Sequence, residues 1–171
     1  MADDAIMTIS AQLLPDEISK TLASQTYSYA PADSTEGWYY KIVDVTTSSA
    51  DLISTETFLQ KGTTAAGVDT GSTMPSIATT DKIKFVYIKH TGYTDDGTTS
   101  NTADSIYVLF DGGTVAHSTV DAIEIGPGES WFGKFNELQV RNLHGISGQK
   151  AGAGTGSNKI QAIVAAIIKD V

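Results

Sequence analysis

One stretch toward the C-terminal end decides the fold class of this chain: Ala122-Ile123-Glu124-Ile125-Gly126-Pro127-Gly128-Glu129-Ser130-Trp131-Phe132-Gly133-Lys134-Phe135. Its two isoleucines alternate with polar neighbours, which is the period of a strand with one buried face. The Gly-Pro-Gly triplet that follows favours a tight turn. Beyond it, Trp131, Gly133 and Phe135 share one face of a second strand. The stretch therefore predicts strand, turn and strand, and with them an antiparallel β fold.

Similar alternation recurs on both sides of this stretch. We expect strands at 5–14, 38–45, 52–61, 82–90, 105–110, 114–119, 122–125, 130–135, 138–146 and 159–168. Turn and loop signals separate them, and Asp111-Gly112-Gly113 is the strongest of these. Such spacing favours an all-β, antiparallel, jelly-roll-like β-sandwich over alternating strands and helices. Residues 1–171 are predicted to form this single domain.

The N-terminal part is predicted to differ from the sandwich. Pro15-Asp16-Glu17 resembles a helix start, which predicts a short helix from Pro15 to Ser24. The composition of 25–37 predicts a loop. Residues 1–30 are therefore expected to form an extended N-terminal arm.

The composition excludes several classes of site and partner. The chain has 171 residues and a net charge of −9, and it contains no cysteine. Disulfides, thiolate metal sites and cysteine nucleophiles are thus excluded, and the acidic balance disfavours direct binding of nucleic acid. The acidic N-terminus does not resemble a signal peptide, and the longest apolar run, 162–168, is too short to span a bilayer. We expect a soluble protein that is made in the cytoplasm and has no membrane partner.

The charge is unevenly distributed along the chain. Residues 1–133 carry 6 basic and 18 acidic side chains, whereas residues 134–171 carry 5 basic and 2 acidic ones. One interpretation is that the C-terminal segment contacts an acidic surface on a neighbouring subunit or a larger assembly. The alternative is a chance excess of charge on solvated faces.

Histidines and acidic residues supply the first candidates for metal or acid–base chemistry. His90, His117 and His144 lie on different predicted elements without a local ligand pair, so each is interpreted as a surface or half-buried side chain. The acidic loop 94–104 could gather oxygens around calcium, but it fails the EF-hand pattern. A solvated loop is the favoured interpretation.

Three further motifs resemble functional sites only in part. The glycine-rich segment 148–157 completes neither a P-loop nor a dinucleotide fingerprint. The turn Pro127-Gly128-Glu129 is similar to that of cupins, but it lacks the histidines that follow it there. Glu124 and Glu129 bracket the same turn and are expected to face solvent. We therefore predict no catalytic, cofactor-binding or metal-binding residue, no cofactor and no enzymatic activity.

Aromatic residues on strands raise a carbohydrate-binding alternative. Trp38, Tyr39, Tyr40 and Trp131 could form a platform for a sugar. The competing interpretation is that these side chains pack in the core.

Several segments resemble small virion proteins of tailed bacteriophages. They are Ile125-Gly126-Pro127-Gly128-Glu129-Ser130-Trp131-Phe132, Asn142-Leu143-His144-Gly145-Ile146-Ser147, Lys159-Ile160-Gln161-Ala162-Ile163-Val164-Ala165-Ala166, Leu13-Leu14-Pro15-Asp16-Glu17-Ile18 and Gly37-Trp38-Tyr39-Tyr40-Lys41. The resemblance implies a capsid decoration, or cement, protein that coats a phage head and stabilises it. It also implies the major capsid protein as partner, a location in the virion and a homotrimer. A phage tail or fibre component and a carbohydrate-binding module are the alternatives.

The docking surface is expected at the loops and at the last strand. The residues assigned to it are Lys150, Lys159, Ile160, Val164, Ile168 and Trp131. The last strand is apolar on both faces, so either it lies in the middle of a sheet or a partner covers it.

Overall fold

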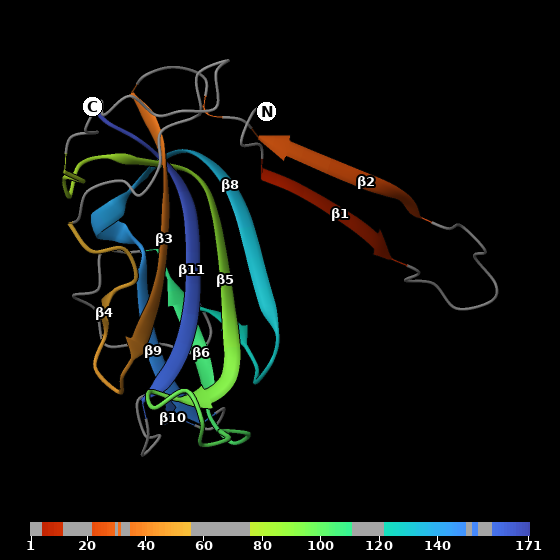
Figure 1. Ribbon diagram of the computed structural model, residues 1–171, viewed down its shortest axis with the longest axis vertical. Helices are drawn as coiled ribbons and strands as arrows, with labels where there is room; N and C mark the ends of the chain where they lie inside the picture. The colour runs from red at the N-terminus through yellow and green to blue at the C-terminus, as the bar shows by residue number, and fades with distance from the viewer. Residues whose placement is uncertain are drawn as a thin grey trace.

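A computed structural model describes residues 5–11, 22–29, 31, 35–55, 76–110, 122–149, 152–153 and 159–171. Within these residues the chain is almost entirely β, and no α-helix occurs (Figure 1). The elements are β1 (Ala5–Ala11), β2 (Leu22–Tyr29), β3 (Glu36–Val45), β4 (Ala50–Asp51), β5 (Lys82–Thr94), β6 (Ser105–Leu109), β7 (Ile123–Ile125), β8 (Ser130–Gln139), the 3-10 turn η2 (Val140–Asn142), β9 (His144–Gln149), β10 (Gly152–Ala153) and β11 (Ile160–Lys169).

Two antiparallel sheets form the body of the molecule. The front sheet has the strand order β3-β11-β5-β8, and the back sheet has the order β10-β9-β6-β7 with β4 also paired to β9. Figure 1 shows the front sheet lying over the back sheet. The predicted antiparallel β-sandwich is confirmed.

The core lies between the two sheets and follows the alternation of the strands. Val86 and Val164 from the front sheet and Ile106 from the back sheet belong to one buried cluster. The last strand, β11, occupies the middle of the front sheet between β3 and β5. Its inward residues are all buried in this cluster: Ile160, Ala162, Val164, Ala166 and Ile168. A strand paired on both edges leaves no ladder group exposed, so the edges of β11 need no partner chain.

The Gly126-Pro127-Gly128 turn connects the two sheets. The backbone N–H of Glu129 donates to the oxygen of Gly126 at 2.9 Å, and the N–H of Gly126 donates to the Glu129 carboxylate at 2.8 Å. Gly128 has φ +79, a conformation that glycine adopts without a steric penalty. The strand before the turn, β7, pairs with β6, whereas the strand after it, β8, pairs with β5. The turn therefore does not close a hairpin.

Two predicted strands differ in the structure. Leu52 and Ile53 follow β4 and lie outside any strand. Both are buried. Consecutive residues of a strand point to opposite faces, so a strand between core and solvent would bury only one of the two. The strand expected at 138–146 is interrupted by η2, where the N–H of Val140 donates to the oxygen of Asp81 at 2.9 Å. This interruption lets the chain pass from the front sheet to the back sheet. Residues 56–61 and 114–119 lie outside the described part of the chain.

The N-terminal prediction was partly wrong. β1 and β2 pair as an antiparallel hairpin, in which Ala11 is opposite Leu22 and Ile9 is opposite Gln25. Residues 22–24 are therefore in a strand instead of a helix end, and residues 25–29 are in a strand instead of a loop. Cross-strand pairing prevails here over the local turn signals. Residues 12–21, the rest of the predicted helix, lie outside the described residues.

Candidate functional site

His90 is fully buried, which corrects the expectation of a surface or half-buried side chain. Its Nδ1 accepts the N–H of Gly92 at 2.9 Å, so its Nε2 carries the proton and donates to the backbone oxygen of Asp104 at 3.1 Å. Burial lowers the pKa of His90, and this outweighs the opposing effects of Asp104 and Glu129. The ring is therefore neutral and ties the end of β5 to the start of β6.

His144 lies in a group of polar side chains that sequence reasoning missed. Its Nε2 is 2.9 Å from the Asp51 carboxylate and 2.8 Å from the backbone oxygen of Arg141, and its Nδ1 is 3.4 Å from the Ser49 hydroxyl. These residue types resemble a nucleophile, a base and an orienting acid. The Ser49 contact is longer than a nucleophile–base hydrogen bond, and Asp51 is exposed to solvent. The contacts join β4 to η2 and the start of β9, so the group holds these three segments together.

The carboxylate of Asp96 stabilises the turn of the acidic loop by accepting hydrogen bonds from within the loop. Asp96 Oδ1 accepts the N–H groups of Thr98 and Thr99, each at 2.7 Å, and the hydroxyl of Thr94 at 2.9 Å. Its Oδ2 accepts the Thr99 hydroxyl at 2.6 Å. These bonds hold the pKa of Asp96 well below its usual range. Calcium would have to displace them, so the predicted solvated loop is the better description.

The carboxylates beside the Gly-Pro-Gly turn do not face a common gap. Glu124 accepts a hydrogen bond from the Ser105 hydroxyl at 2.9 Å, whereas Glu129 folds back onto the N–H of Gly126. Of the glycine-rich segment, Gly148 and Gln149 belong to β9 and pair with β10. Within the described ranges no group of three or more histidine and acidic side chains is placed to hold a metal ion.

The residues assigned to docking do not share one exposed surface in the structure. Ile160, Val164 and Ile168 have no exposed surface, because β11 is central and their side chains point into the core. They cannot contact a partner, and this part of the prediction is corrected. Lys159 is exposed and lies 3.5 Å from the Asp95 carboxylate. Lys150 lies outside the described residues.

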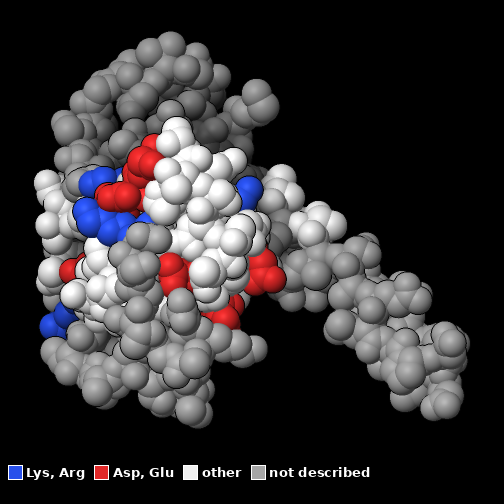
Figure 2. Space-filling model, turned by 90° about the horizontal axis from the view of Figure 1, so that it is seen from below, with Lys and Arg blue, Asp and Glu red and all other residues white. Residues whose placement is uncertain are grey.

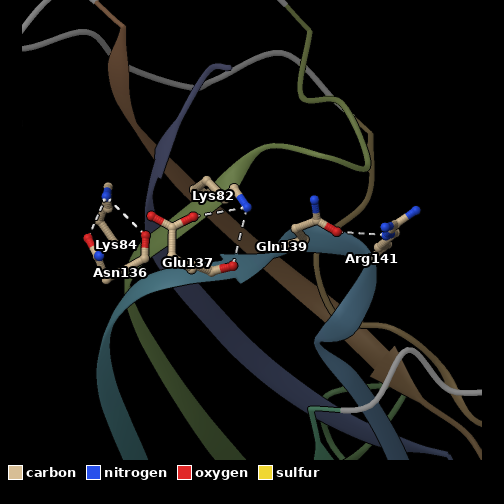
Figure 3. Close-up of polar contacts among 6 residues, drawn as sticks. All are labelled: Lys82, Lys84, Asn136, Glu137, Gln139 and Arg141. Carbon is tan, nitrogen blue, oxygen red and sulfur yellow. Dashed lines mark hydrogen bonds and ion pairs between the residues drawn. The ribbon is translucent and has the colours of Figure 1, made fainter.

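Basic side chains near the start of β5 are held by acceptors on β8. Lys82 Nζ is 3.2 Å from the carboxylate of Glu137, and Lys84 Nζ is 3.1 Å from the backbone oxygen of Asn136. Figure 3 shows these contacts and, beside them, the hydrogen bond that Arg141 Nε donates to Gln139 Oε1. Figure 2 shows basic and acidic side chains lying next to one another, with a broad uncharged area beside them. The described charges on this view do not form a patch of a single sign.

Trp131 is separated from the other aromatic residues proposed as a sugar platform. It faces the inside of the sandwich, where its ring centroid lies 5.7 Å from that of Phe110 and 6.2 Å from that of Phe135. Tyr39 is also buried in the core. Tyr40 lies on the opposite, outward side of the front sheet. The predicted platform therefore divides between two faces of one sheet.

The outward side of the front sheet carries an apolar surface that the sequence analysis did not recognise. Strand register aligns Tyr40, Ala165, Tyr87 and Phe132 in one row across β3, β11, β5 and β8. The outer apolar face consists of this row and its neighbours Trp38, Ile42, Phe85, Ile163 and Ile167.

The exposure of the outer apolar face is uneven. Phe85 and Ile167 are buried beneath their neighbours, with Trp38, Tyr87 and Phe132 packed against them. Tyr40 and Ile42 at the β3 edge are 51% and 50% exposed. Large half-exposed apolar side chains next to a buried outer cluster are typical of an interaction surface.

In the residues that the structure describes, no helix has the length and apolarity to cross a bilayer. A scan of the chain against family models found no matching family, and searches of curated proteins and of solved structures found no match.

Proposed function

We propose that this protein is a structural component of a virus particle, a decoration protein that binds the outside of a phage head. Support comes first from the strand order. Apart from β10, the sandwich has four strands in each sheet, β3-β11-β5-β8 and β4-β9-β6-β7. Successive strands alternate between the sheets except at β6–β7. This order supports the proposal of a jelly roll, a fold common among viral capsid proteins and lectins.

A fold does not specify a function, so the proposal rests on the surface of the sandwich. The observation that carries it is the outer apolar face, in which Tyr40 and Ile42 are half exposed. A face of this kind suits permanent contact between protein subunits, because burying its central row, which contains no charged residue, removes apolar area from water. The resemblance of the quoted segments to small phage virion proteins points to the same class of protein.

The test is to locate the chain in phage particles produced from the genome that encodes it. Immunogold labelling with an antibody against this chain should mark the heads, and deleting the gene should make the heads rupture at a lower temperature. Adding the purified protein back should restore the original rupture temperature. Label confined to tails would support the tail alternative, and particles without the chain would overturn a virion role.

A carbohydrate-binding module is the second candidate, favoured by one specific observation. Tyr40 and Tyr87 lie in the same row of the front sheet, separated by Ala165, and Tyr40 is half exposed. Aromatic rings on a flat sheet can stack on sugar rings. Binding on a glycan array that is lost in Tyr40→Ala would favour this function over the virion role.

A further inference from the structure

The outer apolar face has the organisation of a protein interface. Its central row, from Tyr40 on β3 to Phe132 on β8, contains no charged residue. The row formed by Glu36, Lys169, Lys82 and Gln139 bounds it toward one end of the strands. Asp44 and Gln161 bound it toward the other end, and Lys89 and Lys134 lie in the two rows beside the central one. An apolar centre within a polar rim is the anatomy of a subunit contact.

The β1–β2 hairpin has complementary properties. It forms a sheet of its own and pairs with none of the other described strands. An isolated two-stranded hairpin is at best marginally stable in water, so this element needs a surface to pack on. Neither strand contains an Asp, Glu, Lys or Arg, although the chain as a whole is 18% charged.

Register aligns the apolar residues of the two strands. Met7 is opposite Tyr27, Ala5 is opposite Tyr29 and Ile9 is opposite Gln25. Ile6, next to Met7 in β1, is 68% exposed. These positions are mostly apolar and none of them is charged, so the hairpin matches the uncharged row of the front sheet.

The position of the hairpin favours a contact between chains. Figure 1 shows β1 and β2 extending beyond the β8 side of the sandwich, away from the front sheet of their own chain. Tyr40 and Ile42, by contrast, are at the opposite edge of that sheet, on β3. Each copy therefore presents one hairpin and one apolar face that are separated within the chain.

We propose that the β1–β2 hairpin of one copy docks on the outer apolar face of a second copy. The hairpin packs across Tyr40 and Ile42 and gains the apolar partner that an isolated two-stranded sheet lacks. The central row removes no charge from water, so the desolvation penalty of this contact is confined to Lys89 and Lys134 in the neighbouring rows. The inference goes beyond the proposed function, because it holds for any role in which the protein self-associates.

Disulfide trapping tests this contact in the full chain, which has no cysteine of its own. Two preparations, Met7→Cys and Tyr40→Cys, are mixed and oxidised, so that any disulfide between the two positions must join different chains. A disulfide forms readily only when the two Cα atoms approach within about 7 Å. The matched control mixes Met7→Cys with Tyr93→Cys, because Tyr93 is 43% exposed but lies outside the face.

The expected result is a linked dimer of the two variants in at least about tenfold higher yield than in the Tyr93 control, since docking raises the effective concentration of the thiols. Equal yields in the two mixtures would overturn the proposal. So would a chain carrying both Met7→Cys and Tyr40→Cys that closes a disulfide within itself and forms no dimer.

Light scattering supplies a measurement that needs no cross-link. Ile42→Asp should reduce the weight-average mass of the protein toward 18.0 kDa, whereas Tyr93→Asp should leave that mass unchanged. Circular dichroism checks that both variants remain folded. An unsubstituted protein that has the mass of a single chain at every concentration would also overturn the proposal.

Discussion

The imidazole of His90 bridges two segments of the chain, because its Nε2 lies 3.1 Å from the backbone oxygen of Asp104 while its Nδ1 accepts the N–H of Gly92. A proton added to Nδ1 would break the second of these bonds and place a charge in the core. The fold therefore prefers the neutral ring, and burial lowers the pKa of His90 below its ordinary value of 6.5.

The first prediction concerns stability against pH. Below pH 6.5 the unfolded chain protonates this histidine while the folded chain resists, so the free energy of unfolding should fall as the pH is lowered from 6.5 toward the lower folded-state pKa. Urea unfolding at a series of pH values measures this loss. His144→Gln should retain this loss, since it leaves His90 in place. A loss of the same size in His90→Phe would contradict the assignment.

The second prediction concerns Gly133, which lies between two aromatic residues on the inner face of β8. A Cβ at this position would lie 2.6 Å from the Trp131 ring and 2.8 Å from the Phe135 ring. Gly133→Ala should lower the free energy of unfolding by about 1–3 kcal/mol, because the packed rings must move. Urea unfolding measures the change.

A double-mutant cycle provides the control for Gly133. In a Phe135→Leu background one of the two clashing rings is absent, so Gly133→Ala should be less destabilising there than in the unsubstituted protein. Additive effects of the two substitutions would show that the loss does not arise from contact with the Phe135 ring.

The third prediction concerns Asp96, whose carboxylate accepts hydrogen bonds from Thr94, Thr98 and Thr99. These bonds lower the pKa of Asp96, so their stabilising effect is complete above its ordinary pKa of 3.8 and is lost as the pH falls through the lower folded-state value. Carbon NMR should show that the pKa of Asp96 lies below its ordinary value of 3.8. Asp96→Asn should speed amide exchange at Thr99, and Asp95→Asn should not.

The fourth prediction concerns the group formed by Ser49, His144 and Asp51. If these side chains only hold the strands together, the protein and its Ser49→Ala variant should hydrolyse p-nitrophenyl acetate at the same rate. Asp51→Asn should instead lower the free energy of unfolding by up to about 1 kcal/mol, because a contact of an exposed carboxylate contributes little. Hydrolysis abolished by Ser49→Ala would identify the serine as a nucleophile.

Local alternation was sufficient to predict several strands but not their partners. The pattern at 82–90 identified most of β5, and the pattern at 159–168 identified β11. The partners could not be predicted, because the side-chain period is the same whichever strand lies alongside. The strands on either side of the Gly-Pro-Gly turn illustrate this point, since they belong to different sheets.

The candidate sites were less predictable than the strands. The apolar residues of β11 were assigned to docking because both of its faces are apolar, and only the sheet order shows that Val164 faces the core while Ala165 lies on the outer apolar face. Ser49 and His144 are 95 residues apart, so no local motif joins them. The local signal of the outer face was the recurrence of large apolar residues at every second position, Trp38, Tyr40 and Ile42.

The central place of β11 has a consequence for how the protein is synthesised. The strands β3 and β5 do not pair with each other, and each forms its ladder with β11. The ribosome synthesises β11 only after β4 to β10. Until then, β3 and β5 lack the strand that lies between them in the finished sheet, and the edge of each that pairs with β11 is open. Such non-local pairing slows folding and exposes the unfinished sheet to neighbouring nascent chains.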